Sequence, residues 1–143
     1  MDINRDTMAS LANELRETYG KSYIIEQLAK KALKDSENCI IESIRASGEA
    51  IAIKKQPNSF LLAVDANIDL RYERILKRGS ETDQIDFNTF KANENREMNS
   101  DDPNKQNLSK CIEMADYKII NNGSIELLHK NIESFLSYIK KSK

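Results

Sequence analysis

The stretch at residues 59–79 reads SFLLAVDANIDLRYERILKRG and joins two different patterns. Its first part, residues 59–65, is a short and almost uniformly apolar run, which predicts a strand buried on both faces. The residues after it repeat their apolar side chains at helical spacing, and Gly79 supplies a stop signal. A buried strand that leads directly into a helix is typical of an α/β protein with a parallel sheet.

The same alternation continues on both sides of this stretch. Two more apolar runs, residues 39–44 and 117–120, predict two further strands. Helical spacing predicts helices at residues 4–19, 22–33, 48–56, 66–78, 108–115 and 124–139. We therefore expect one domain over residues 1–143, in which residues 79–107 form a polar, lid-like and partly helical excursion.

Composition argues against several classes of protein. The chain has 22 basic and 23 acidic residues and a net charge of −1, so a broad basic surface for nucleic acid is not expected. No apolar run is long enough to span a membrane, and the polar start MDINRDTM predicts no signal peptide. Cys39 and Cys111 fit no zinc spacing and have isoleucine neighbours, which predicts buried thiols in a reduced, cytoplasmic compartment.

Common catalytic motifs are absent from the sequence. It contains no GxxxxGK[ST] loop to cradle phosphates, no HExxH and no CxxC. The single histidine, His129, lies in the last expected helix beside two leucines, where we expect a packing or surface role. Nucleophilic catalysis by Ser or Cys therefore lacks a base, and arginine is the residue type left to carry chemistry.

Arg45 and Glu42 lie near the carboxyl end of the first expected strand, where open parallel sheets collect ligands. The Arg45 guanidinium can hold a phosphate through two parallel hydrogen bonds, and a surface ion pair is the alternative. Glu42 stands in a run of isoleucines, where an inward carboxylate needs a partner. That partner is a Mg²⁺-bound water or a substrate proton, or, as the alternative, Arg45 itself.

Three more arginines share one face of the helix at residues 66–78, namely Arg71, Arg74 and Arg78. Arg78 directly precedes the polar excursion, a position from which a lid can neutralise a phosphate during transfer. The alternative is a solvated face whose arginines pair with acidic neighbours on the same helix, Asp69 and Glu73. The first helix leaves the same two interpretations open for Arg5 and Arg16.

Four segments together resemble one family. VDANIDLRYERILKRGS (residues 64–80) resembles the strand, helix and lid entry of dephospho-coenzyme A kinases and related nucleoside monophosphate kinases. ADYKIINNGSIELLHKNIESFL (residues 115–136) is similar to their last strand, loop and helix. ESIRASGEA (residues 42–50) is similar to a D-S-I-R-x-x-x-E pattern in relatives, some of them associated with deoxycytidylate metabolism. NRDTMASLANELRETYG (residues 4–20) resembles their acceptor-side helix.

The resemblance implies a P-loop kinase-like, three-layer α/β/α fold whose first strand and helix, which carry the P-loop, are absent from this chain. It implies ATP and Mg²⁺ as cofactors, and transfer of phosphate to dephospho-coenzyme A or a (deoxy)nucleoside monophosphate if a P-loop completes the protein. By position, Arg78 and Arg74 are the implied catalytic lid arginines. The other implied site residues are Arg45, Arg5, Arg16 and Glu49 for the acceptor, Asn122 and Gly123 for ATP, and Glu42 for the metal.

The missing first strand leaves three arrangements open, because that strand lies in the middle of the sheet in this fold. The chain is part of a longer product, the sheet closes up around the gap, or a partner chain or second copy supplies the strand. A second function also stays open, namely a catalytically inactive, stand-alone nucleotide-binding or protein-interaction protein of the same fold.

Overall fold

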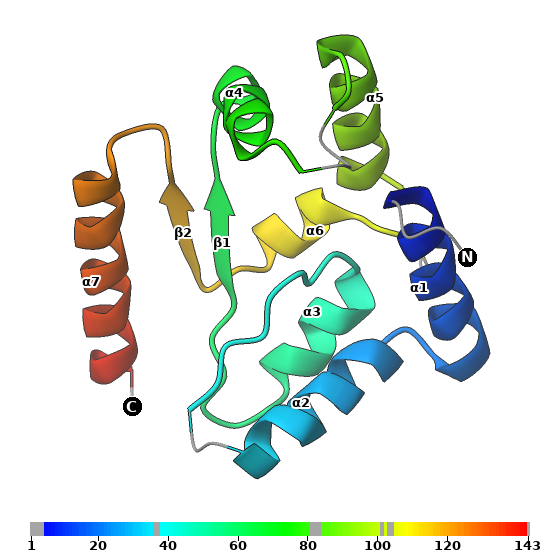
Figure 1. The fold of residues 1–143 in the computed structure, drawn as a ribbon. Coiled ribbons are helices and arrows are strands. Elements are labelled where there is room, and N and C mark those ends of the chain that lie inside the picture. The colour runs from blue at the N-terminus through cyan, green and yellow to red at the C-terminus, as the bar shows by residue number, and fades with distance from the viewer. Residues whose placement is uncertain (1–4, 36–37, 81–83, 101, 103–104, 143) are drawn as a thin grey trace.

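The computed structural model describes residues 5–35, 38–80, 84–100, 102 and 105–142 (Figure 1). Helices dominate this part of the chain, and two short strands lie among them. In chain order the elements are α1 (Arg5–Tyr19), α2 (Tyr23–Asp35), α3 (Ser47–Lys54), β1 (Leu62–Asp65), α4 (Ile68–Arg78), α5 (Phe87–Met98), α6 (Leu108–Glu113), β2 (Tyr117–Ile120) and α7 (Ile125–Lys141). The protein is therefore α/β, as the alternating pattern predicted.

The sheet consists of β1 and β2, which pair directly and in parallel. Leu62 lies opposite Tyr117 and Asp65 opposite Ile120, so both strands end at the same edge of the sheet. Figure 1 shows the two arrows pointing the same way, with α7 alongside β2 and α4 following directly from β1.

The prediction of a strand at residues 39–44 is wrong, because the structure forms no strand there. Ser43 has a φ of 65°, in the left-handed region, and this interrupts the extended backbone that a strand requires. Ile40 is 95% exposed, and Cys39 is exposed as well. The prediction of two buried thiols therefore holds for Cys111, which is buried, and is wrong for Cys39.

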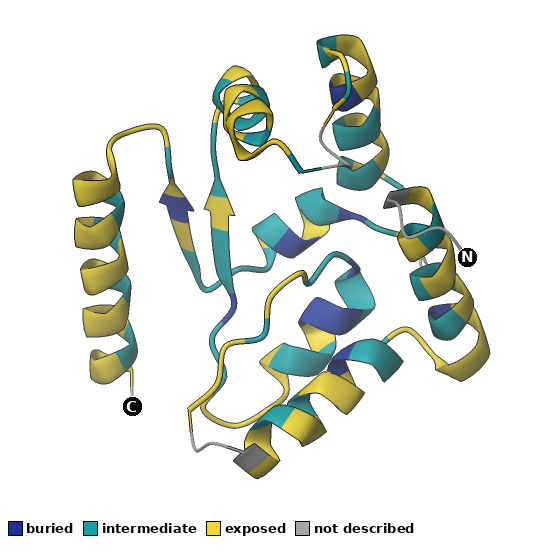
Figure 2. Cartoon of the chain, in the orientation of Figure 1, coloured by how far each residue is buried: buried dark blue, intermediate teal, exposed yellow. Residues whose placement is uncertain are grey.

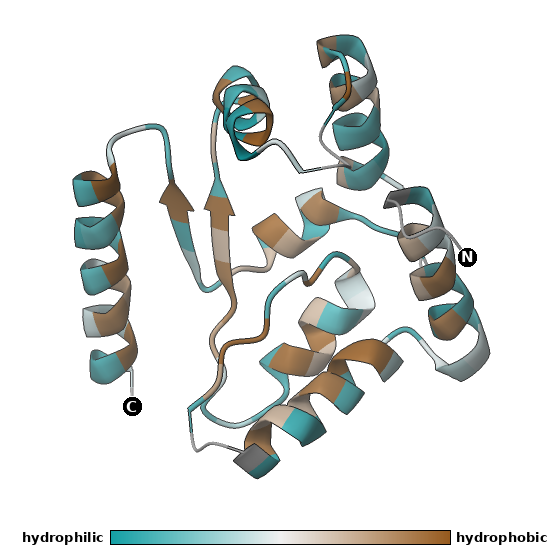
Figure 3. Cartoon of the chain, viewed as in Figure 1, coloured by the Kyte–Doolittle hydropathy of each residue, from teal (hydrophilic) through white to brown (hydrophobic). Residues whose placement is uncertain are grey.

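Two small clusters hold the helices in place. Ala50, Leu61 and Cys111 form a buried cluster that joins α3, the start of β1 and α6. A second cluster joins α4 to α5, where the ring of Tyr72 lies 5.4 Å from that of the buried Phe90. Figure 2 shows that the buried and half-buried residues lie where neighbouring elements face one another, and Figure 3 shows apolar residues on the side of α7 that faces β2.

Local signals at the helix ends act as the sequence predicted. Gly20 and Gly79 follow α1 and α4 with φ values of 104° and 63°, a conformation that costs glycine little. The side chain of Ser124 accepts a hydrogen bond from the Leu127 N–H and caps α7. Among the described residues, no helix combines the length and the apolar character needed to cross a membrane.

Candidate functional site

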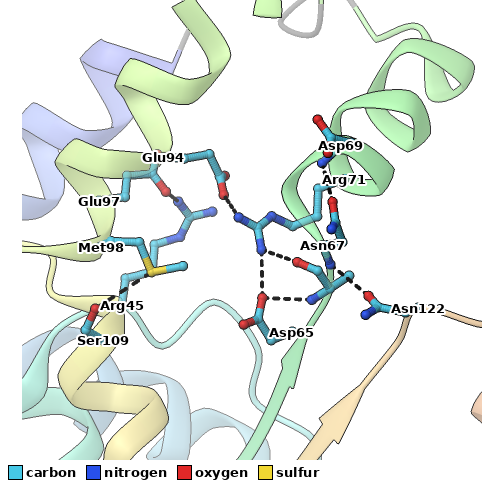
Figure 4. Close-up of polar contacts among 11 residues, drawn as sticks. Arg45, Asp65, Asn67, Asp69, Arg71, Glu94, Glu97, Met98, Ser109 and Asn122 are labelled. Carbon is cyan, nitrogen blue, oxygen red and sulfur yellow. Dashed lines mark hydrogen bonds and ion pairs between the residues drawn. The ribbon is translucent and has the colours of Figure 1, made fainter. Parts of the chain in front are cut away.

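The carboxyl ends of β1 and β2 carry the main polar cluster of the described residues (Figure 4). Asp65 is the last residue of β1, Asn67 caps α4, and Asn122 lies in the loop after β2. The Asn67 N–H donates a hydrogen bond to the Asn122 Oδ1 at 2.7 Å, which ties together the two loops that leave the sheet. Ligands of open α/β sheets bind outside this edge, so it is the first place to look for a site.

Arg71 reaches from α4 back to the end of β1. Its Nη1 donates to the Asp65 Oδ1 at 2.7 Å and to the Ala66 carbonyl, while its Nη2 lies 2.6 Å from the Glu94 Oε2 on α5. The side chain is 25% exposed, and its buried Nε has no hydrogen-bond partner among the described residues. The guanidinium therefore lies between the sheet edge and α5, and it has a donor left over.

Arg45 lies in the turn before α3, and its side chain also reaches α5. Its Nη1 is 2.8 Å from the Glu97 Oε2, and its side chain is 44% exposed. Its carbonyl accepts a hydrogen bond from the Asn107 N–H at 2.8 Å, which fixes the backbone from which the side chain extends. Glu94 and Glu97 are one turn apart on α5, so a single helix presents one carboxylate to each of two arginines (Figure 4).

Arg16 and Glu49, both predicted to bind the acceptor, form a buried ion pair with each other. The Arg16 Nη1 lies 2.9 Å from the Glu49 Oε1, and the two side chains are 3% and 5% exposed. The Glu49 Oε2 accepts the N–H groups of Arg45 and Ala46 at 3.2 and 3.1 Å. This pair joins α1 to α3 and stabilises the turn that carries Arg45. Arg5 is the first residue of α1, and its side chain lies outside the described part of the chain.

Arg74 and Arg78 lie on the exposed side of α4. The Arg74 Nη1 donates to the Asn121 carbonyl at 2.9 Å, in the loop after β2. Arg78 is the last residue of α4. Of the three arginines on this helix, Arg71 is the one that meets Asp65 at the sheet edge, and the catalytic roles of Arg74 and Arg78 stay predictions.

The candidates for ATP and metal binding come from two different loops. Asn122 uses its Oδ1 to accept the Asn67 N–H, and Gly123 is exposed in the loop before α7. Glu42 is exposed, so the prediction that its carboxylate points inward is wrong. The alternative, an ion pair between Glu42 and Arg45, is not formed either, because Arg45 pairs with Glu97. The described residues contain no group of three His, Cys, Asp or Glu side chains that could hold a metal ion.

Sequence reasoning did not select Asp65, Glu94 or Glu97. Asp65 carried a usable signal, since a carboxylate that ends a buried strand lies at the ligand edge of a parallel sheet. Glu94 and Glu97 showed only a spacing of three residues, which is common on exposed helices. Their meeting with Arg71 and Arg45 depends on where α5 packs, and no local pattern encodes that.

The fold and this cluster define an α/β protein with an arginine- and carboxylate-lined edge at the ends of two parallel strands. Its homologues are UPF0200 proteins. It is 31% identical over 127 residues to one from Methanococcus maripaludis, an alignment that covers 87% of this chain and 66% of the relative. Relatives from Staphylothermus marinus and Methanocaldococcus jannaschii are each 27% identical, over 94% and 97% of this chain and 68% and 69% of their own lengths.

The chain thus spans about two thirds of the length of these relatives. No family model matches it. No solved structure matches it either.

Proposed function

We propose that this protein binds a phosphorylated, nucleotide-like small molecule at the carboxyl edge of β1 and β2. One observation carries the proposal: Arg45 and Arg71, from different elements, both bind carboxylates at this edge. A guanidinium binds phosphate oxygens with the same fork of donors that it uses for carboxylates. The Arg71 Nη2, which now lies 2.6 Å from the Glu94 Oε2, is a donor that a ligand oxygen can take over.

The resemblance to dephospho-coenzyme A kinases extends this proposal to a reaction. In it, the chain is part of a P-loop kinase-like, three-layer α/β/α protein that transfers phosphate from ATP to dephospho-coenzyme A or a (deoxy)nucleoside monophosphate. The parallel strands, the arginines on α4 and the loop at Asn122 and Gly123 support this view. Glu42 is a single exposed carboxylate and does not by itself form a Mg²⁺ site, so we derive no step through a metal.

A second candidate is an inactive nucleotide-binding or protein-interaction protein of the same fold. The sequence contains no GxxxxGK[ST], and β1 and β2 pair with no strand between them. A protein that binds anions at this edge without such a loop does not hold the ATP phosphates for transfer. The kinase and an inactive nucleotide-binding protein share the ligand site and differ only in turnover.

Isothermal titration calorimetry with ATP, ADP, deoxycytidine monophosphate and dephospho-coenzyme A tests the binding. The protein is expected to bind at least one of them, and Arg71→Met is expected to weaken that binding about tenfold or more, since a hydrogen bond to a charged group contributes about 1.5–3 kcal/mol. Lys77→Met, which removes a cation from the exposed side of the same helix, is the matched control and leaves affinity unchanged. No binding of any nucleotide at millimolar concentration overturns the proposal.

Turnover then separates the two candidates. Transfer of radiolabelled phosphate from ATP to one of these acceptors supports the kinase. Binding with no transfer supports the inactive protein.

A further inference from the structure

The geometry points to α5 as a competitor built into this site, because Glu94 and Glu97 form ion pairs with Arg71 and Arg45. The ligand that replaces these two glutamates is one that carries two linked phosphate groups. The inference rests on the proposed function and adds both the ligand class and the way in which the protein itself neutralises the two arginines. It starts from two ion pairs, at 2.6 and 2.8 Å, that one helix makes with two separate elements.

The spacing of the two glutamates sets the spacing of the anions. Residues three apart on a helix have Cβ atoms about 5–6 Å apart and lie on one face. Arg45 and Arg71 therefore hold two anions that belong to a single short scaffold, as Figure 4 shows. A ligand with one phosphate replaces one carboxylate and leaves the other in place, whereas a diphosphate replaces both.

Asp65 makes the two arginines unequal. Asp65 bonds to the Arg71 Nη1 and Glu94 to the Nη2, so displacement of Glu94 is expected to leave Arg71 with one carboxylate partner at the end of β1. An incoming phosphate therefore finds Arg71 already oriented, with its Nη2 available once Glu94 leaves. Arg45 has Glu97 as its ion-pair partner and is the more exposed of the two. Removing Glu97 frees this guanidinium for a ligand.

The anchoring of α5 does not depend on the two glutamates. Phe90 is buried, and the Tyr72 ring lies 5.1 Å from Phe87 and 5.4 Å from Phe90. Asp86 caps the helix by accepting the N–H groups of Asn88 and Thr89. Glutamine has the shape of glutamate, so Glu94→Gln with Glu97→Gln is expected to leave the helix in place while it removes both charges.

The test is calorimetric titration of inorganic pyrophosphate and inorganic phosphate into the wild type and the Glu94→Gln/Glu97→Gln variant. Loss of two competing anions is expected to raise the affinity for pyrophosphate about tenfold, and that for phosphate about threefold, on the scale of individual ion pairs. Glu73→Gln, an exposed substitution on α4, measures the effect of charge alone and is expected to change neither affinity.

Two results overturn the inference while the proposed function stands. In the first, nucleotide binding depends on Arg71, and yet the Glu94→Gln/Glu97→Gln variant binds pyrophosphate no more tightly than the Glu73→Gln variant does. The other is an equal gain for phosphate and pyrophosphate, which removes the requirement for two linked groups. If neither protein binds any of these anions or nucleotides, the proposed function fails and the inference fails with it.

Discussion

The buried ion pair between Arg16 and Glu49 gives the sharpest stability prediction. Replacing Arg16 with Met leaves the Glu49 carboxylate 5% exposed and without its cation. Breaking a buried pair in this way costs about 3–5 kcal/mol. The N–H groups of Arg45 and Ala46 still bond to the Glu49 Oε2, so we expect the lower end, about 3 kcal/mol. That is a large share of the roughly 5–15 kcal/mol that stabilises a typical domain.

Urea unfolding followed by circular dichroism measures this loss, which should lower the midpoint by roughly 2 M. Arg96→Met is the matched control, because Arg96 pairs with Asp6 in an ion pair whose side chains are both exposed, and little change is expected. In the Arg16→Met protein, a second change of Glu49 to Gln should restore at least about 1 kcal/mol, because it removes the unpaired charge. A loss below about 1 kcal/mol for Arg16→Met, or further destabilisation by the second change, would show that the buried pair does not stabilise the protein in this way.

Three other predictions concern single side chains. Burial raises the pKa of Asp116, but the hydrogen bonds from Lys54 and the Leu61 N–H outweigh it and lower the pKa below the ordinary value. The ionised carboxylate therefore stabilises the fold above about pH 4, and this contribution is lost as pH falls further. Asp116→Asn removes it and should be about 1–3 kcal/mol less stable to urea at pH 7. Burial raises the pKa of the Cys111 thiol to about 11, so iodoacetamide should label exposed Cys39 alone in the native protein at pH 8, as peptide mass spectrometry would show. Phe90→Ala should cost about 3–5 kcal/mol in thermal unfolding, because it empties the contact between α4 and α5.

The elements with local signals were the predictable part of the fold. A glycine in the left-handed conformation ends α4, and a serine side chain caps α7, as their positions after and before apolar patterns indicated. The run at residues 39–44 shows the limit of such patterns. Its composition suits a strand, but a strand also needs a hydrogen-bonding neighbour and an unbroken extended backbone, and Ser43 does not have that backbone.

The sequence predicted where the candidate site lies but not which residues form it. The carboxyl edge of the parallel strands followed from the order of the elements, whereas Arg45 was selected because it follows residues 39–44, where the structure forms no strand. Arg71, and not Arg74, lies in the site because it pairs with Asp65 and with Glu94, which is 23 positions further along the chain. The pairing of Arg16 with Glu49 spans 33 positions, so no periodicity could distinguish it from a ligand-binding pair.

Our proposal places a phosphorylated ligand on Arg45 and Arg71 at the ends of β1 and β2. The most direct measurement is an NMR titration of ADP that follows the guanidinium Nε–H signals. We expect the signals of Arg45 and Arg71 to shift together and saturate, while that of Arg96, which pairs with exposed Asp6, does not move. Saturable binding of ADP that leaves both the Arg45 and the Arg71 signals unchanged would show that the ligand binds elsewhere.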